Sequence, residues 1–411
     1  MHRLERPTQV PRVLFVNRFY FPDHSATSQL LTDLTRALAR ERQVLVLTSR
    51  QRYQSAAANL TGHETIDAVE IVRTWGTAFG RDRLPGRLAD YITFMLSAGL
   101  WMLRNLRATD TLVLMTDPPM LSIVGELAAS ARSARTINWI QDLFPDTAIA
   151  LNMRAVRPLA PALSTLRDRL FQRARINVVI GNRMRDRLRA RQPGACFQVI
   201  HNWAPGDEVV PVAREDNRLR QEWGLGSSLV VGYSGNMGRA HDFSTVLATA
   251  ERVRHLDVKF LFIGDGPQRR VIEAEANSKG LQNIIFKPYQ PREHLSSSLS
   301  APDIHLVSLN PELEGCIVPS KFYGIAAAGR PTLFVGACDG EIATLLRTHQ
   351  CGFAVSEGDE AGMTDVITRL CHDRVALKQL GLAARHAYET EFSFAHALRE
   401  WHAVLESAAD A

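Results

Sequence analysis

Ser320 and Lys321 follow Pro319 at the start of a short, alanine-rich segment that is predicted to be a helix. Gly329 ends this segment, and Pro331 lies two residues further on, which is the usual order at a helix C-terminus. The unpaired N–H groups at a helix start favour a bound anion, whereas a lysine is unfavourable there unless an anion is present. The pattern therefore indicates an anion site. The alternative is that Ser320 only caps the helix and Lys321 points into solvent.

The run from Glu314 to Pro331 resembles the sugar-nucleotide donor loop of the family-4 glycosyltransferases. These are retaining, metal-independent enzymes of GT-B fold, and the resemblance is to the bacterial branch that builds O-antigen and capsule-type polysaccharides. A looser resemblance extends from Arg12 to the C-terminal helix. The broad family has two glutamates in this loop, and Cys316 and Gly324 occupy the matching positions. The resemblance thus implies that Lys321 and Glu314 carry more of the donor site.

The other predicted donor residues lie in loops that follow apolar runs of the second half. Gly235 and Gly238 allow a diphosphate to approach the backbone, and the guanidinium of Arg239 can bind phosphate through two hydrogen bonds. By resemblance we expect Lys321 and Arg239 to stabilise the leaving diphosphate. For Asp265, a role in a tight turn is an equally good interpretation. The predicted donor-binding set is Ser234, Gly235, Asn236, Gly238, His241, Gly264, Asp265, Tyr289, Glu314 and Ser320.

The first half carries the residues expected on the acceptor side. Gln141 and Asp142 follow an apolar run and resemble the polar pair of the family's His-Asp-Leu-x-Pro loop, with Gln141 where histidine is common. A carboxylate there can orient or deprotonate an acceptor hydroxyl, although Asp142 would also suit a helix N-cap. Asp23 and His24 lie in an earlier loop and could face the acceptor. A capped helix start is the favoured interpretation of that pair.

The elements that position these residues alternate between short apolar strands and amphipathic helices, which predicts parallel, doubly wound sheets. With 411 residues the chain is too long for one ordinary core. We expect a GT-B arrangement of two doubly wound, Rossmann-like α/β domains that face a cleft. The predicted boundaries are 1–205 for the acceptor-binding domain, 206–392 for the nucleotide-sugar donor-binding domain, and 393–411 for a C-terminal helix that returns to the first domain.

Charge is divided unevenly between the two halves. Residues 1–205 contain 28 arginines, no lysine and 16 acidic residues, a net charge of +12, whereas the remainder has 20 basic and 27 acidic residues, a net charge of −7. The basic half suits anionic lipid headgroups, phosphorylated acceptors or nucleic acid. Nucleic acid ranks last, because no zinc-finger, helix-turn-helix or RNA-binding signature is present.

The segment from Tyr91 to Leu103 is apolar nearly all round, with Arg87 before it and Arg104 and Arg107 after it. It is too short to span a bilayer. A core helix is one interpretation, and a helix lying in the membrane interface is the other. Five scattered cysteines without metal-ligand spacing indicate a reducing compartment and thiols that pack. No spanning segment or signal peptide is recognised, so we expect a cytoplasmic protein with peripheral membrane contact.

These observations, with the resemblance, predict a retaining glycosyltransferase in cell-surface polysaccharide biosynthesis. Its donor would be a nucleoside-diphosphate sugar, with UDP as the default in this branch, and its acceptor a hydroxyl of a lipid-linked glycan. No cofactor is expected, and no catalytic metal, since no Asp-x-Asp motif follows a strand. The alternatives are a nucleotide-sugar 2-epimerase of the same fold and a non-catalytic, glycosyltransferase-like binding subunit.

Overall fold

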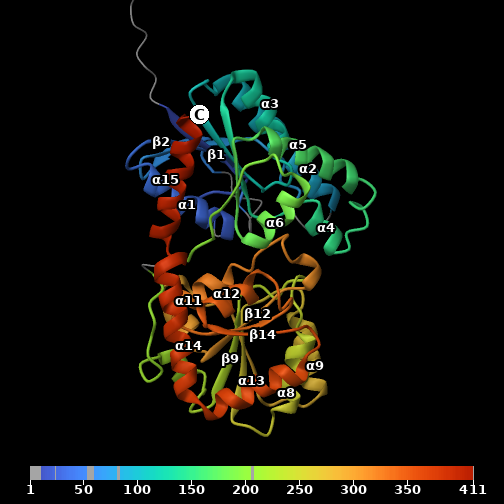
Figure 1. Cartoon of the computed structure of the whole chain (residues 1–411), viewed down its shortest axis with the longest axis vertical. Coiled ribbons are helices and arrows are strands. Elements are labelled where there is room, and N and C mark those ends of the chain that lie inside the picture. The colour runs from blue at the N-terminus through green and yellow to red at the C-terminus, as the bar shows by residue number, and fades with distance from the viewer. Residues whose placement is uncertain (1–10, 24, 53–59, 81–83, 205–207, 411) are drawn as a thin grey trace, which may run out of the picture. The chain divides into compact units, whose positions relative to one another are not determined.

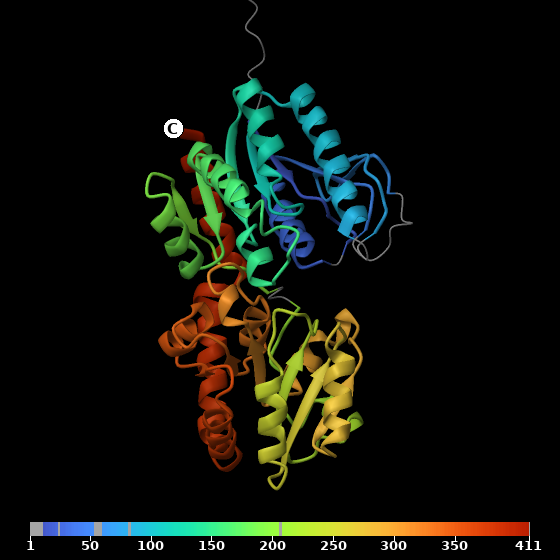
Figure 2. The ribbon, with the colours of Figure 1, turned by 90° about the vertical axis from the view of Figure 1, so that its right-hand side faces the viewer.

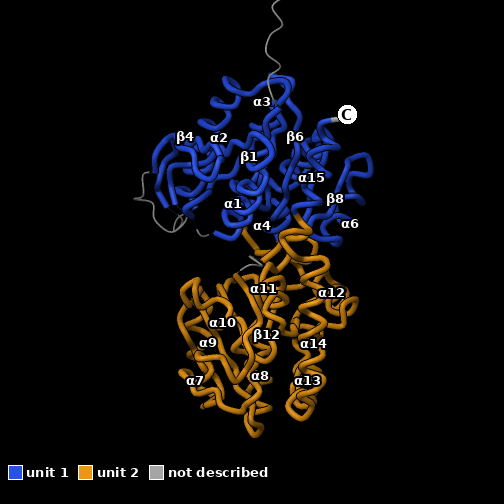
Figure 3. The backbone as a smooth tube through the Cα atoms, turned by 90° about the vertical axis from the view of Figure 1, so that its left-hand side faces the viewer, with its two compact units in different colours: residues 1–149, 154–200, 398–411 blue, residues 150–153, 201–397 orange. Residues whose placement is uncertain are grey.

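The computed structural model describes residues 11–23, 25–52, 60–80, 84–204 and 208–410. The chain forms two compact units, shown in different colours in Figure 3. Unit 1 comprises residues 1–149, 154–200 and 398–411, and unit 2 comprises residues 150–153 and 201–397. Apart from residues 150–153, the chain passes from the first unit to the second at residue 201 and back at residue 398. The sequence analysis placed these points at residues 206 and 393.

Unit 1 is built on an eight-stranded sheet of the order β3-β4-β2-β1-β5-β6-β7-β8. Neighbouring strands are parallel except β3 and β4, which are antiparallel at one edge. The strands are β1 (Arg12–Val16), β2 (Gln43–Ser49), β3 (His63–Ile66), β4 (Val69–Thr74), β5 (Thr111–Met115), β6 (Arg135–Ile140), β7 (Ile176–Val179) and β8 (Phe197–Val199). Central strands such as β5 are buried at every residue, as expected for a parallel sheet covered on both faces.

Helices cover both faces of this sheet. They are α1 (Ala26–Leu38), α2 (Leu84–Asn105), α3 (Ser122–Arg132), α4 (Asp146–Ala150), α5 (Ala160–Arg173), α6 (Asn182–Arg191) and α15 (Phe394–Asp410). Leu14 and Val16 on β1 pack with Phe94 and Met102 of α2, and α2, α3 and α5 lie side by side on that face (Figure 2). The intervening Phe15 points the other way, because side chains alternate along a strand, and its ring contacts Trp401 of α15.

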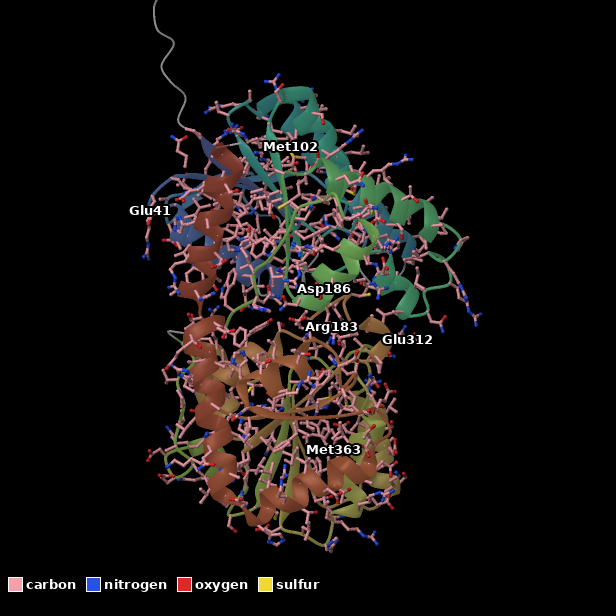
Figure 4. All side chains as sticks on the ribbon, viewed as in Figure 1. Glu41, Met102, Arg183, Asp186, Glu312 and Met363 are labelled. Atoms are coloured by element: carbon pink, nitrogen blue, oxygen red, sulfur yellow. The ribbon has the colours of Figure 1, made fainter. Side chains whose placement is uncertain are left out.

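Unit 2 is built on a six-stranded, wholly parallel sheet of the order β11-β10-β9-β12-β13-β14. Its strands are β9 (Leu229–Ser234), β10 (Val258–Ile263), β11 (Ile284–Lys287), β12 (Ile304–Ser308), β13 (Thr332–Val335) and β14 (Gly352–Val355). Its main core lies between one face of this sheet and a layer of helices. Met102 in unit 1 and Met363 in unit 2, both labelled in Figure 4, are fully buried in their respective interiors.

The helices of unit 2 are mostly short, and Figure 1 labels the longer ones. They are α7 (Arg218–Glu222), α8 (Ser244–Arg252), α9 (Arg269–Ser278), α10 (Leu295–Ser300), α11 (Lys321–Ala327), α12 (Glu341–His349), α13 (Glu360–His372) and α14 (Arg374–Ala387). Two 3-10 turns, η1 (Arg292–His294) and η2 (Pro311–Leu313), and a π-helical turn, η3 (Tyr388–Phe392), complete the unit.

The strand orders locate the place in each unit where a ligand is expected. In unit 1 the chain winds outward in opposite directions from β1 and β5, and in unit 2 from β9 and β12. Open parallel sheets bind ligands outside the carboxyl ends of the strands at this switch point. The residues that follow β1, β5, β9 and β12 are therefore the best candidates for ligand binding.

Two features of the structure were not visible in the sequence. The region between β2 and β4 contains β3, which pairs with β4 as an antiparallel hairpin. The two turn residues, Asp67 and Ala68, have φ values of 51° and 64°. Such turns usually contain glycine, so the hairpin has no clear signature in the sequence. All five cysteines are free, as expected, but Cys196 and Cys338 are exposed rather than packed.

No described helix is both long and apolar enough to cross a lipid bilayer.

Candidate active site

Lys321 is the first residue of α11, and its side chain extends to the carboxyl end of β9. An added Cβ on Gly235, just after β9, would lie 2.7 Å from Lys321 Cε, which shows how closely the lysine packs on that turn. The ammonium lies 4.9 Å from the centroid of the Tyr233 ring, within range of a cation–π interaction. Lys321 thus occupies the switch point of unit 2, where the topology predicts a ligand.

His241 holds the lysine in this position. Its Nδ1 lies 2.6 Å from the carbonyl oxygen of Ser308, the last residue of β12, and its Nε2 lies 3.3 Å from Lys321 Nζ. A carbonyl can only accept, so Nδ1 carries the proton and Nε2 accepts from the ammonium. Burial and the positive charge of Lys321 lower the pKa of His241 to about 4. His241 is therefore neutral at pH 7 and joins β12 to the lysine.

Lys321 has no carboxylate partner among the residues that the structure describes. Burial alone accounts for the fall of its pKa from 10.5 to about 8. A largely buried ammonium without a counter-charge is unfavourable, and an anion bound beside it would remove that cost. The geometry is that of a cationic anion-binding site with no anion supplied by the described protein.

Two glycine turns border the same end of the sheet. Gly235, after β9, and Gly264, after β10, have φ values of 127° and 129°, which L-residues with a side chain rarely adopt. Gly235 N donates to Ile263 O at 2.8 Å, and Met237 N donates to Asp265 O at 2.8 Å. Asp265 itself accepts a hydrogen bond from Gly266 N through its carboxylate, which favours the tight-turn interpretation of this residue.

The remaining predicted donor residues differ in their exposure and in their hydrogen bonds. Asn236, Arg239 and Tyr289 are exposed around these turns, and Gly238 O accepts from Gln268 Nε2 at 2.6 Å. Ser234 ends β9 and is half-buried. Ser320 precedes α11 but makes no capping hydrogen bond through its side chain. Glu314 is engaged elsewhere, because its Oε1 accepts from Glu341 N at the start of α12.

In unit 1, Asp142 follows β6 at the carboxyl edge of the sheet. Its N–H lies 3.3 Å from the hydroxyl of Thr116, which follows β5. The surrounding protein, which displaces water, and then the charge of Asp117 raise the pKa of Asp142 to about 6. Because Asp142 keeps exposed surface, we give the repulsion from Asp117 the greater weight. A carboxyl with this pKa is largely ionised at pH 7 and can accept a proton.

The other predicted acceptor residues differ in their surroundings. Gln141 is buried beside Asp142, and its N–H lies 3.2 Å from the same Thr116 hydroxyl. Asp23 is buried and accepts from Ser25 N at 2.8 Å, just before α1. The favoured interpretation was a capped helix start, but the N-cap residue Ser25 makes no capping hydrogen bond through its side chain. His24 lies outside the described residues.

The sequence analysis missed two features at the switch point of unit 1. Asp117 follows β5, and its charge raises the pKa of Asp142. Arg18 follows β1 and is buried, with its guanidinium 3.3 Å from the carboxylate of Asp90 on α2. An ionisable residue directly after each central strand was the available signal for both. No cluster of three or more possible metal ligands occurs within the described ranges.

Comparison with known proteins shows which family model and which relatives this chain matches. Residues 228–373 match the family model described as glycosyl transferases group 1. The probable glycosyltransferase WbjE of Pseudomonas aeruginosa is 26% identical over 298 residues, which is 70% of this chain and 72% of WbjE. The putative colanic acid biosynthesis glycosyl transferase WcaI of Escherichia coli K12 is 26% identical over 264 residues, covering 61% of this chain and 64% of WcaI.

The fold has close counterparts among solved structures. The structure of HepE from Anabaena in complex with UDP-glucose superposes with a TM-score of 0.68 at 15% identity, and the match covers 96% of this chain and 99% of HepE. At that identity the likeness establishes the fold alone. The segment that matches the family model, residues 228–373, begins at β9 and includes Lys321, His241 and both glycine turns. We conclude that residues 228–373 form a domain of the glycosyl transferases group 1 family, and that the chain is a glycosyltransferase of GT-B fold.

Proposed function

We propose that this glycosyltransferase moves a sugar from a UDP-sugar to a hydroxyl of a lipid-linked glycan, with retention of configuration and without a catalytic metal, in the biosynthesis of a cell-surface polysaccharide. Two similar proteins support the choice of donor and the kind of pathway. WcaI is described as acting in colanic acid biosynthesis, and HepE was solved with UDP-glucose.

The observation that carries the proposal is the half-buried ammonium of Lys321, which has no carboxylate partner among the described residues, at the switch point between β9 and β12. Bond cleavage at the anomeric carbon leaves negative charge on the diphosphate. A cation that is already in place and partly shielded from water stabilises that charge far more than it would in water. Neutral His241 fixes the direction of the ammonium without competing for the phosphate.

The glycine turns complete the donor site in this proposal. Gly235 and Gly264 lie at the ends of β9 and β10, where a Cβ on Gly235 would press on Lys321 Cε and a Cβ on Gly264 would clash with the Gly235 carbonyl. Both glycines therefore keep Lys321 and the turn after β9 in place beside the proposed donor site. Arg239 is exposed just beyond and can reach a phosphate oxygen as the donor binds. Tyr289, also exposed, offers an aromatic face to the base.

Asp142 is assigned to the acceptor. Its pKa of about 6 places it close to the pH at which a general base works best. A carboxylate with this pKa can orient the acceptor hydroxyl and take part of its proton as the new glycosidic bond forms. The surrounding protein, which displaces water, and the charge of Asp117 together raise that pKa.

The test is incubation of the purified chain with UDP-sugars, with and without a polyprenyl-diphosphate-linked acceptor. We expect release of UDP to depend on both acceptor and Lys321. Conversion of the nucleotide sugar in the absence of acceptor would instead identify a 2-epimerase. Binding of UDP without any turnover would identify a binding subunit. Thermal shift with UDP is an independent readout, since ligand at 100 times its Kd stabilises by about 2.7 kcal/mol.

A further inference from the structure

Helix α2 presents an uncharged, apolar face to the outside of the molecule. The exposed side chains on it recur every three or four residues, which places them along one side of a helix. The face runs for roughly 29 Å at 1.5 Å per residue. Its members are Leu84, Leu88, Ile92, Leu96, Leu100 and Leu103, and Leu96 is 64% exposed. We call this set the α2 face.

The opposite side of α2 packs into the core of unit 1. Phe94, Ala98 and Met102 are buried in the core of unit 1. The α2 face is thus additional apolar surface that the described chain does not cover. Monomeric proteins rarely leave so long a contiguous apolar surface in water unless it binds something.

Polar side chains of α2 fix the backbone at two aromatic residues beside this helix. The carboxylate of Asp90, 2% exposed, accepts from Thr77 Oγ1, from Phe79 N and from Gly80 N. Ser97 Oγ donates to Trp75 O at 2.5 Å. Trp75 and Phe79 are nevertheless 61% and 71% exposed. Their backbone is fixed while their rings face outward, which is the arrangement expected of anchors rather than of core residues.

Charge on the surrounding helices is entirely positive at the surface. The three acidic residues of α2, α3 and α5 are Asp90, Glu126 and Asp168, and all of them are buried. By contrast, arginines at or near the C-terminal ends of these helices are exposed: Arg104, Arg107, Arg132, Arg169 and Arg173. We call these arginines the basic edges of the layer that α2, α3 and α5 form in Figure 2, with the apolar α2 face on one side of that layer. Leu127 on α3 and Leu166 on α5 extend the apolar area.

We propose that the α2 face and its basic edges dock the protein on an anionic lipid bilayer. A helix of this kind lies in the plane of the interface, with aliphatic side chains among the acyl chains and cations at the headgroups. A second copy of the chain fits less well, because symmetric pairing would bring arginines against arginines. The inference does not depend on the transfer chemistry, although it would bring the enzyme to a lipid-linked acceptor.

Co-sedimentation with vesicles tests this docking. We expect the full chain to bind vesicles that contain about 30% phosphatidylglycerol, and to bind less as salt rises, since the Debye length shortens. Leu96→Glu with Leu100→Glu should lower the partition coefficient at least tenfold. The matched control is Val271→Glu with Leu382→Glu, which adds the same charge at similarly exposed apolar positions of unit 2. The control should bind like the unchanged protein.

The cationic edge has its own variants. Arg104→Gln with Arg107→Gln should weaken binding by about fivefold for each charge and reduce its salt dependence. Arg218→Gln with Arg254→Gln, which removes the same charge from unit 2, should not. Quenching by brominated lipid that is lost on Trp75→Phe would place that ring in the acyl region.

Several results would overturn the docking model. They are equal binding of the Leu96/Leu100 variant and its control, absence of binding to anionic vesicles, or a dimer in light scattering that the Leu96/Leu100 variant abolishes. Circular dichroism and UDP thermal shift report whether each variant is folded. Because UDP binding should be unchanged in all of them, failure of membrane docking is distinguishable from failure of the proposed transferase function.

Discussion

The affinity for UDP should fall as pH rises from 7 to 9, and Lys321 should be the cause. Its pKa of about 8 means that roughly nine-tenths of the molecules carry the ammonium at pH 7, and about one-tenth at pH 9. If the diphosphate binds only the charged form, the apparent Kd rises about tenfold over this range, which corresponds to about 1.4 kcal/mol. The bound form holds the proton more tightly than the free form, so the sign is a loss of affinity with rising pH.

Isothermal titration calorimetry measures both the affinity and the proton. At pH 8 we expect uptake of about half a proton for each UDP bound, seen as a heat that depends on the ionisation enthalpy of the buffer. The variant Lys321→Met should bind weakly at all pH values and take up no proton through this group. The arginine of the Lys321→Arg variant stays charged from pH 7 to 9. The affinity of this variant for UDP should therefore not change through titration of residue 321.

Titration of UDP itself appears equally in all three proteins, so the difference between them isolates the lysine. An unchanged pH profile in Lys321→Met would refute the assignment of the ammonium to the diphosphate. A flat profile in the unchanged protein would show that the ligand does not distinguish the two forms of Lys321.

Three further predictions concern other residues. Asp142→Asn should lower turnover and remove the rise in kcat expected near pH 6, while UDP affinity stays within about twofold; loss of UDP binding instead would place Asp142 on the donor side. His241→Ala should weaken UDP binding about tenfold or more, since a hydrogen bond to a charged group contributes roughly 1.5–3 kcal/mol; unchanged affinity would show that Lys321 needs no support. Phe392→Ala should destabilise unit 2 by about 3–5 kcal/mol, measured by denaturant unfolding, because its buried ring packs edge-on against Phe322 and Tyr323 of α11; a loss below 1 kcal/mol would contradict that packing role.

Local patterns were sufficient to predict the parallel sheets and the position of Lys321. Buried apolar runs such as Thr111–Met115 and Thr332–Val335 form strands of the two parallel sheets. Lys321 was predicted from its place at a helix start, and α11 begins at that residue. Such features depend on residues within a few positions of each other, so one stretch of sequence contains the whole signal.

The arrangement around the lysine could not be predicted in the same way. The tautomer of His241 depends on the Ser308 carbonyl, 67 residues away in the sequence. The pKa of Asp142 depends on Asp117 at the end of a neighbouring strand. The outward side of α2 was also undecided, because its sequence is apolar on both sides. Only the packing of Phe94 and Met102 into the core shows which side remains exposed.

The loop that resembles the family-4 donor loop provides no carboxylate to pair with Lys321. Cys316, at one of the matching glutamate positions, is fully buried, and Gly324, at the other, has no side chain. Glu314 in the same loop accepts from the start of α12. No carboxylate in the described part of unit 2 therefore neutralises the ammonium, and burial lowers its pKa toward the physiological range. The diphosphate of the donor would be the first anion to neutralise it. The binding free energy of the donor would therefore vary with pH through the titration of Lys321.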